Sequence, residues 1–311
     1  MVVAIGATAT LLVTSSRSVP FAGGYGWPQA LVFAALIAAT DPIAVVALFK
    51  SLGAPRRLGV LIEAESVVND GTAIVLFTIV LAAVSGGSTS VAAGAVEFVR
   101  VVGVGVVIGA LVGATTSRVI RRIEEPMIEI ALTTIAAYGS FVAAEGLHAS
   151  GVIATVTACV LCGSFASLSM SASTRVVVSS FWQYVAFALN SIVFLLIGLE
   201  VPIERLVSAW RPIALAFLAV NGGRALIVLL ASVLLWRTNE RIPWRWGVIL
   251  TWGGLRGALS MVLALALPAD FSHRELIVTM TLGVVLLSIV IQGITTGPLL
   301  RALGLAGAPK R

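Results

Sequence analysis

The sequence predicts an all-α, polytopic membrane helix bundle. Three observations support this class. The 311 residues are 59% hydrophobic and 11% charged, with a mean hydropathy of +1.07, whereas soluble domains carry about 25% charged residues. Apolar runs long enough to cross a bilayer follow one another along the whole chain. Two of these runs are interrupted by helix-breaking residues close to buried charges. The chain is therefore expected to form one transmembrane domain, residues 1–311.

The net charge of +6 does not indicate nucleic-acid binding, because the basic residues lie in short clusters between apolar runs. Cys159 and Cys162 have neither a second cysteine pair nor a nearby histidine, so we expect no structural metal centre and no cofactor.

Each apolar run of about 20 residues is a candidate transmembrane helix. The ten predicted spans are 1–16, 29–49, 58–84, 98–117, 127–145, 149–168, 177–199, 209–236, 245–268 and 275–300. With the first residue inside, thirteen Lys and Arg residues fall on the inside and five on the outside. The positive-inside rule therefore predicts that both ends of this chain are cytoplasmic.

The span 29–49 carries a carboxylate at mid-membrane depth within Thr40-Asp41-Pro42. Proline has no amide hydrogen and clashes with the preceding turn, so we expect the helix to break there. Carbonyl groups freed by the break must be satisfied by protein or by a water-filled cavity. Beside a carboxylate, such carbonyls can ligate a cation.

The span 58–84 contains Glu65-Ser66-Val67-Val68-Asn69-Asp70-Gly71. Ser66 and Asp70 are four residues apart and share one helix face, so hydroxyl and carboxylate oxygens can form the ligand set that hard cations prefer. Glu65 points elsewhere and needs an arginine partner, because an unpaired carboxylate at that depth is costly. Asn69 shares the face of Glu65 and is expected to bond backbone groups freed by the break.

The span 245–268 is interrupted by Gly253-Gly254-Leu255-Arg256-Gly257, and Arg224 lies at the centre of 209–236. Three glycines in five residues weaken a helix and allow a close backbone approach. Paired interrupted spans in the two halves of a chain indicate inverted-topology repeats whose interrupted helices cross at a binding site. A purely structural ion-pair cluster is the alternative, but charges at bilayer depth more often mark function.

These three motifs, in their order and spacing, resemble the NhaP/NHE-type sodium/proton antiporters of the monovalent cation:proton antiporter group, over essentially the whole chain. The resemblance implies that Asp70 alternately holds a cation or a proton and that Asp41, Ser66 and the Thr40 carbonyl help to coordinate Na+. It also implies a Glu65–Arg224 ion pair, and an Arg256 that balances partial charges in the second break. Asn69 stands where electrogenic relatives have a second Asp, which implies electroneutral exchange.

The family resembles thirteen-span bundles in which the Thr-Asp-Pro helix is the fifth span. Here that helix is the second span, so the first three spans of the family are expected to be absent. The resemblance implies an ion-binding core, residues 1–84 and 209–300, and scaffold and linker helices, residues 98–199. It further implies a homodimer for a form that has all the spans.

We therefore expect a secondary antiporter, not an enzyme, that exchanges a monovalent cation for H+ across the cell membrane. The sequence does not distinguish Na+ from Li+ or K+, and a K+/H+ antiporter and a cation channel stay open as alternatives. A channel usually needs symmetric rings of ligands. An intramembrane aspartyl protease would need neither buried arginine, and its usual Gly-x-Gly-Asp pattern is missing around Asp70.

Overall fold

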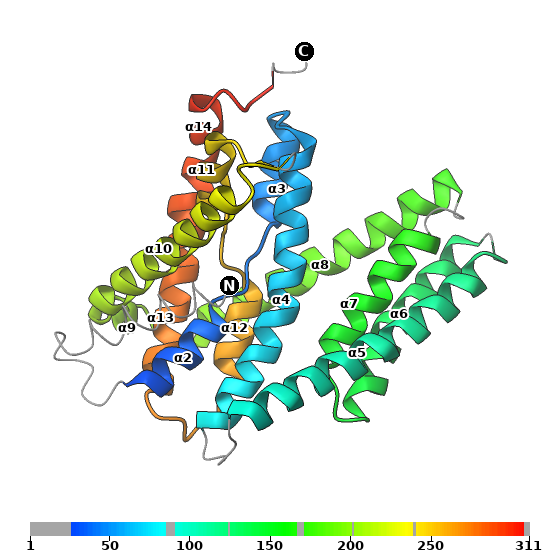
Figure 1. The fold of residues 1–311 in the computed structure, drawn as a ribbon, viewed down its shortest axis with the longest axis horizontal. Helices are drawn as coiled ribbons and strands as arrows, with labels where there is room; N and C mark the ends of the chain where they lie inside the picture. The colour runs from blue at the N-terminus through cyan, green and yellow to red at the C-terminus, as the bar shows by residue number, and fades with distance from the viewer. Residues whose placement is uncertain are drawn as a thin grey trace. The chain divides into compact units, whose positions relative to one another are not determined.

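The computed structural model describes residues 26–84, 91–123, 125–166, 171–200, 202–238 and 241–307. Within these ranges all regular structure is helical (Figure 1), which confirms the predicted all-α class. Six of the described helices are long and apolar enough to cross a membrane. The predicted span 1–16 lies outside the described residues.

The chain divides into two compact units. One contains Met1–Ser85 and Phe194–Arg311, and the other contains Gly86–Val193.

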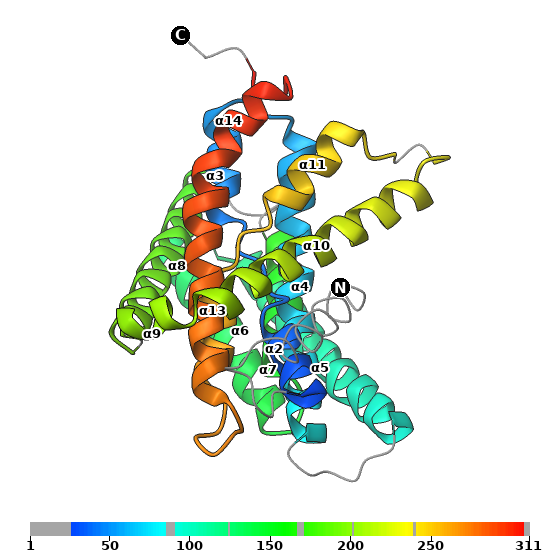
Figure 2. The same cartoon turned by 90° about the vertical axis from the view of Figure 1, so that its left-hand side faces the viewer.

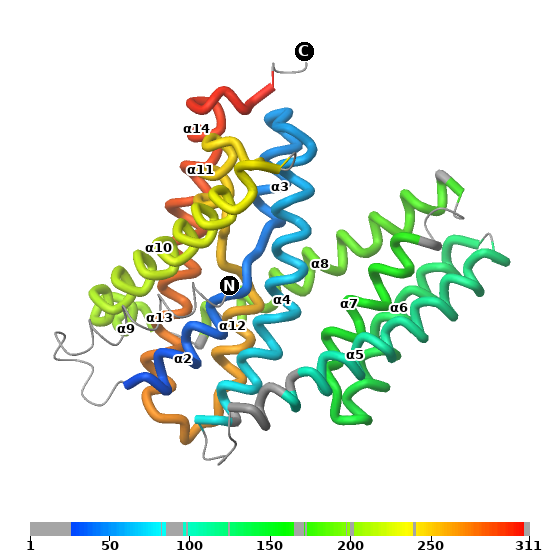
Figure 3. The backbone as a smooth tube through the Cα atoms, viewed as in Figure 1, coloured from blue at the N-terminus to red at the C-terminus, as the bar shows by residue number. Residues whose placement is uncertain are grey.

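The first unit contains two helices that are broken in mid-course. The predicted span 29–49 consists of α2 (Trp27–Leu36) and α3 (Ile43–Ser51), and the span 245–268 consists of α11 (Trp244–Trp252) and α12 (Ala258–Leu265). The backbone tube leaves the helical path between the two halves of each pair (Figure 3). Both interruptions predicted from the sequence are therefore confirmed, and α2 contacts α12 across them.

Unbroken helices surround the two breaks. They are α4 (Arg56–Val84), the short α9 (Ile203–Ser208), α10 (Trp210–Leu234), and the continuous run of α13 (Arg274–Leu287), η3 (Ser288–Gly293) and α14 (Ile294–Ala302). Figure 2 shows α10 crossing α13, and these helices are in contact. The stretch η3 is π-helical, a deviation that often occurs at functional sites. The sequence predicted neither η3 nor α9.

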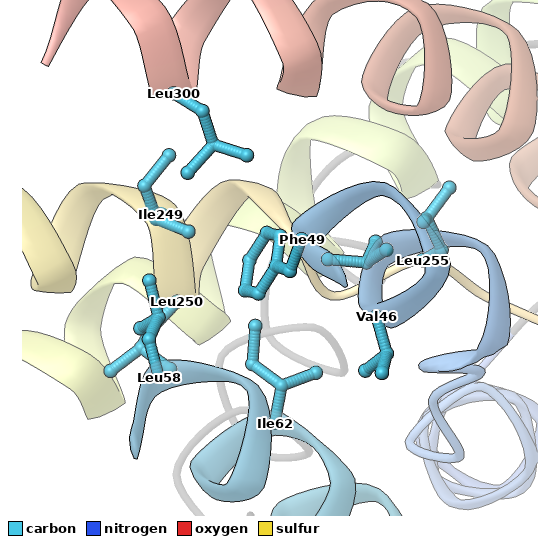
Figure 4. Packing of buried hydrophobic residues seen from close by; sticks show 9 residues of the cluster. Val46, Phe49, Leu58, Ile62, Ile249, Leu250, Leu255 and Leu300 are labelled. Carbon is cyan, nitrogen blue, oxygen red and sulfur yellow. The ribbon is translucent and has the colours of Figure 1, made fainter. Parts of the chain in front are cut away.

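A buried apolar cluster joins the second half of the first broken pair, α3, to the first half of the second pair, α11, and to their neighbours. Phe49 of α3, Ile62 of α4, Ile249 of α11 and Leu300 of α14 pack together (Figure 4). Leu255, within the second break itself, belongs to the same cluster. The cluster therefore ties the backbone of one break to the helix that follows the other.

The second unit contains α5 (Val91–Ile120), α6 (Pro126–Glu145), α7 (Gly151–Leu161) with η2 (Cys162–Ala166), and the first part of α8 (Ala172–Glu200). The helix α7 begins where the Ser150 hydroxyl accepts a hydrogen bond from the Ile153 amide, 3.3 Å away, a standard N-cap. Helices α5, α6 and α7 pack side by side (Figure 1).

Candidate functional site

The first break is a stretch of irregular, non-helical backbone between Leu36 and Ile43. The amides of Ile37 and Ala38 still bond carbonyls of α2, whereas the next described amide hydrogen bonds go to groups outside that helix. The Asp41 amide donates to the Leu255 carbonyl, 2.8 Å away in the second break. The Asp41 carboxylate accepts from the Ile43 amide, two residues on, at 3.0 Å, a local Asx-type turn just before α3. A backbone hydrogen bond thus joins the two breaks directly.

Asp70 lies on α4 opposite this break. Its carboxylate accepts a hydrogen bond from the Thr40 amide at 3.3 Å. One turn earlier, the buried Ser66 hydroxyl donates to the Thr40 carbonyl. The structure therefore brings together three residues that the sequence placed in one ligand set, with Thr40 bridging the other two.

Arg256 satisfies the carbonyls at the end of α2. Its Nη1 donates to the Ala38 carbonyl at 3.0 Å and to the Ala39 carbonyl at 3.1 Å, and the residue is buried. The C-terminal end of a helix carries partial negative charge. A guanidinium there compensates the carbonyls that the break leaves without helical partners.

Glu65 and Arg224 form a two-pronged ion pair. Both guanidinium nitrogens Nη1 and Nη2 lie 2.7 Å from the carboxylate oxygens, and Arg224 Nε donates to the Leu250 carbonyl at 2.7 Å. Arg224 is buried, whereas the Glu65 side chain is 35% exposed. The pair connects α4 to α10, and the third donor connects α10 to α11.

The sequence suggested that Asn69 bonds backbone groups freed by the break, but its described hydrogen bonds go to side chains. Its amide nitrogen lies 3.4 Å from the Thr40 hydroxyl and 3.3 Å from a Glu65 carboxylate oxygen. Asn69 therefore links the ion pair to the first break through side chains. The expectation was wrong because Glu65, one turn away on the same face, competes for the amide.

The glycines of the second break make room for charged side chains. A Cβ on Gly254 would lie 2.7 Å from Arg224 Cδ and closer still to Nε, and a Cβ on Gly257 would lie 2.8 Å from Asp41 Oδ2. Gly253 ends α11, where its amide donates to the Ile249 carbonyl. Glycine is therefore required at 254 and 257 by close approach.

A cavity of about 300 Å³ opens beside these residues. Its lining includes Glu65, Asn69, Arg224, Arg256 and Ala38. The described site has three carboxylates (Asp41, Glu65, Asp70) and two guanidiniums (Arg224, Arg256), a formal net charge of −1. One bound monovalent cation, or one proton, would bring it to zero.

The sequence analysis did not identify three polar residues of this region, Asn221, Ser288 and Gln292, as part of the site. Ser288 accepts a hydrogen bond from the Arg256 amide, and Gln292 donates to Asn221. Lone polar residues in apolar spans more often join helices than form sites. The sequence offered one indication, which is that Ser288 and Gln292 are four residues apart and so share a helix face.

Comparison with known proteins agrees with this arrangement. The family described as "Sodium/hydrogen exchanger, transmembrane" matches residues 1–302. The chain is 39% identical over 282 residues to the Na+/H+ antiporter NhaG of Bacillus atrophaeus, covering 89% of this chain and 53% of that protein. It is 40% identical over 297 residues to the Na+/H+ antiporter NhaP of Pseudomonas aeruginosa, covering 92% and 69%.

The chain thus spans about half the length of the first of these curated relatives. Among solved structures, the sodium proton antiporter MjNhaP1 from Methanocaldococcus jannaschii at pH 8 superposes with a TM-score of 0.77 at 18% identity, over 99% of this chain and 77% of that one. This likeness shows a shared fold. The family match, which covers nearly all of this chain, shows that the chain belongs to the transmembrane sodium/hydrogen exchanger family.

Proposed function

We propose that this protein is a secondary active antiporter that exchanges Na+ for H+, and that Asp70 carries both ions in turn. The observation that supports this most directly is the placement of Asp70. Its carboxylate accepts a hydrogen bond from the backbone of a helix break at Thr40, beside a buried hydroxyl. Oxygen ligands of this kind suit hard monovalent cations, and relatives with 39% and 40% identity are named Na+/H+ antiporters.

The exchange follows from competition at one carboxylate. Asp70 can be protonated or can bind a cation, but not both at once. In this proposal, Asp41, Ser66 and the Thr40 carbonyl supply further oxygen ligands, while Glu65 and Arg224 hold the helices in place. The formal charge of −1 in the described site suits a single positive charge in either form. We therefore propose one-for-one, electroneutral exchange.

We propose that the unit containing α2–α4 and α10–α14 is the ion-binding core and that α5–α8 belong to the scaffold. Broken helices whose halves meet at a site are typical of transporters that alternate access to a central site. We further propose a cell-membrane location, with both ends of this chain cytoplasmic on the basis of the Lys and Arg distribution. For a form that has all the spans of the family we propose a homodimer in the lipid bilayer.

The purified protein in lipid vesicles tests this function. An inward gradient of Na+, Li+ or K+, imposed in turn, should drive protons outward and make the lumen alkaline for the transported ions. Asp70→Asn should abolish the response, because it removes both the proton site and the anionic ligand, while the protein still inserts into vesicles.

Glu63→Gln is the matched control. Glu63 is an acid on the same helix, exposed and 3.6 Å from Lys50, and its loss should leave exchange intact. Retained sodium-driven proton movement in Asp70→Asn vesicles would overturn the mechanism. A response to K+ alone would make the protein a K+/H+ antiporter, and non-saturating flux without proton coupling would make it a channel.

A further inference from the structure

The helix running from Arg274 to Ala302 carries two buried polar side chains within its π-helical stretch. Ser288 and Gln292 are each 1% exposed, and both lie in η3. Neither contacts Asp70 through any described hydrogen bond, and the cation-binding proposal above does not use them. Each bonds a different neighbouring element of the same unit. The buried hydroxyls of Thr279, Thr281 and Thr296 differ, because their described hydrogen bonds go to carbonyls of this helix.

Ser288 is bonded to the second break. Its hydroxyl accepts a hydrogen bond from the Arg256 amide at 3.1 Å and donates to the Val285 carbonyl at 2.8 Å. The residue before Arg256, Leu255, accepts the amide of Asp41 at 2.8 Å. The Leu255 carbonyl and the Arg256 amide belong to one peptide group, which thus connects η3 to the first break. Because the break has no helical hydrogen bonds of its own, the Arg256 amide takes the Ser288 hydroxyl as its partner instead.

Gln292 is bonded to α10. Its side-chain nitrogen donates to Asn221 Oδ1 at 2.6 Å, and the Asn221 nitrogen donates to the Phe217 carbonyl at 2.8 Å. Asn221 precedes Arg224 by three residues, so the two are neighbours on the helix surface. The bond therefore fixes the rotation of α10 one turn before the guanidinium that pairs with Glu65.

We propose that Ser288 and Gln292 are positioning residues that set the location of Arg256 and Arg224 around the ion-binding carboxylate. This rests on the proposed function. A π-helical turn differs from an α-helix by one residue of register. In η3 this shift lets Ser288 reach the second break while Gln292, four residues later, reaches α10. Purely apolar side chains would fill the same space without fixing either arginine.

The test compares Ser288→Ala and Gln292→Met with the unmodified protein and with Thr281→Val. Thr281 lies on the same helix, is fully buried, and its hydroxyl bonds only the Ile277 carbonyl among the described hydrogen bonds. Sodium-driven proton exchange in vesicles is recorded over a range of pH and Na+ concentration. Protection by Na+ against thermal unfolding is measured in parallel, because it reports cation binding without transport.

We expect Ser288→Ala and Gln292→Met to raise the apparent KM for Na+ about tenfold or more, as loss of outer partners does at metal sites. The pH of half-maximal exchange should shift, while the maximal rate changes less. Ser288→Thr, which keeps the hydroxyl, should recover the normal KM. Thr281→Val should lower thermal stability without moving either the KM or the pH profile.

Variants that lose only stability or maximal rate, or a Thr281→Val protein with the same shifts, would show that these residues serve packing alone and overturn the inference. If Ser288→Ala does not fold, Gln292→Met decides by the same measurements. An unmodified protein that neither exchanges nor gains stability from Na+ would overturn the proposed function and this inference together.

Discussion

At the scale of single residues, the ion pair between Glu65 and Arg224 has the strongest geometry in the described core. Two charge-assisted hydrogen bonds of 2.7 Å join the side chains, and a third joins Arg224 to the Leu250 carbonyl. Paired, parallel bonds between guanidinium and carboxylate are among the stronger hydrogen bonds in proteins. A surface pair such as Lys50–Glu63, at 3.6 Å with both side chains exposed, contributes little.

Removing both partners of this pair should therefore destabilise the protein less than the sum of removing each one alone. Glu65→Gln or Arg224→Gln leaves an uncompensated charge, and each should cost about 3 kcal/mol of unfolding free energy. The double variant should cost clearly less than the sum of the two. Thermal unfolding of the four proteins in detergent measures the coupling, and strict additivity would mean that the two side chains do not interact. Lys50→Gln with Glu63→Gln supplies the exposed control pair.

A second residue-scale prediction concerns Gly254. A methyl group there would overlap Arg224, so Gly254→Ala should displace the guanidinium and cost about 1–3 kcal/mol, the usual range for overpacking. Gly247→Ala is the control on α11, because its Cβ would meet Val228 at an ordinary 3.7 Å. Equal unfolding temperatures for the two variants would contradict the close approach.

At the scale of elements, the packing of α5 against α7 depends on a row of small residues. Gly105, Gly109 and Gly113 recur every four residues on α5, and a Cβ on any of them would press against α7. At Gly109 it would lie 2.8 Å from Thr157 Cβ and closer still to the Ala154 carbonyl. Small residues at this spacing let helix backbones approach closely within a membrane.

Gly109→Ala should accordingly separate α5 from α7 and lower the free energy of unfolding by about 1–3 kcal/mol. Gly103→Ala, on the same helix with open space around it, should be neutral or slightly stabilising, since alanine favours a helix over glycine. Thermal unfolding distinguishes the two. A larger loss in Gly103→Ala than in Gly109→Ala would mean that α5 faces α7 through another surface.

At the scale of the whole molecule, the charge balance of the described site sets the stoichiometry expected of the proposed exchange. The described site has a formal charge of −1, from three carboxylates and two guanidiniums. Either one Na+ or one H+ brings the charge of this site to zero. The neutral Asn69, which bonds Glu65 and Thr40, adds no further carrier.

Exchange should therefore be insensitive to membrane potential. Clamping vesicles with K+ and an ionophore should leave the sodium-driven pH change nearly untouched. A carrier that moves one net charge would respond strongly, because a charge crossing 100 mV gains about 2.3 kcal/mol. Asn69→Asp provides the comparison, since a second acid at that position offers another proton site. A strong voltage response in the unmodified protein would mean that a second carboxylate, such as Asp41, also carries a proton.

The sequence by itself determined the helical membrane class, the positions of both helix breaks, and the charged residues that lie in or near apolar helices of the core. Each of these follows from local chemistry. Apolar runs need lipid, Pro42 removes a backbone donor, and glycines weaken a helix. The predicted inverted repeat stays a prediction.

Only the tertiary structure decided which partner each polar group meets. Arg256 reaches the Ala38 and Ala39 carbonyls, more than 200 residues away along the chain, and its amide bonds Ser288. The Asn69 side chain donates hydrogen bonds to Glu65 and the Thr40 hydroxyl rather than to the freed backbone. Spacing along one helix shows which residues share a face, but the neighbour that each face meets depends on how distant helices pack. In a membrane a buried polar group must still find a partner, so packing fixes the site that the sequence could only list as candidates.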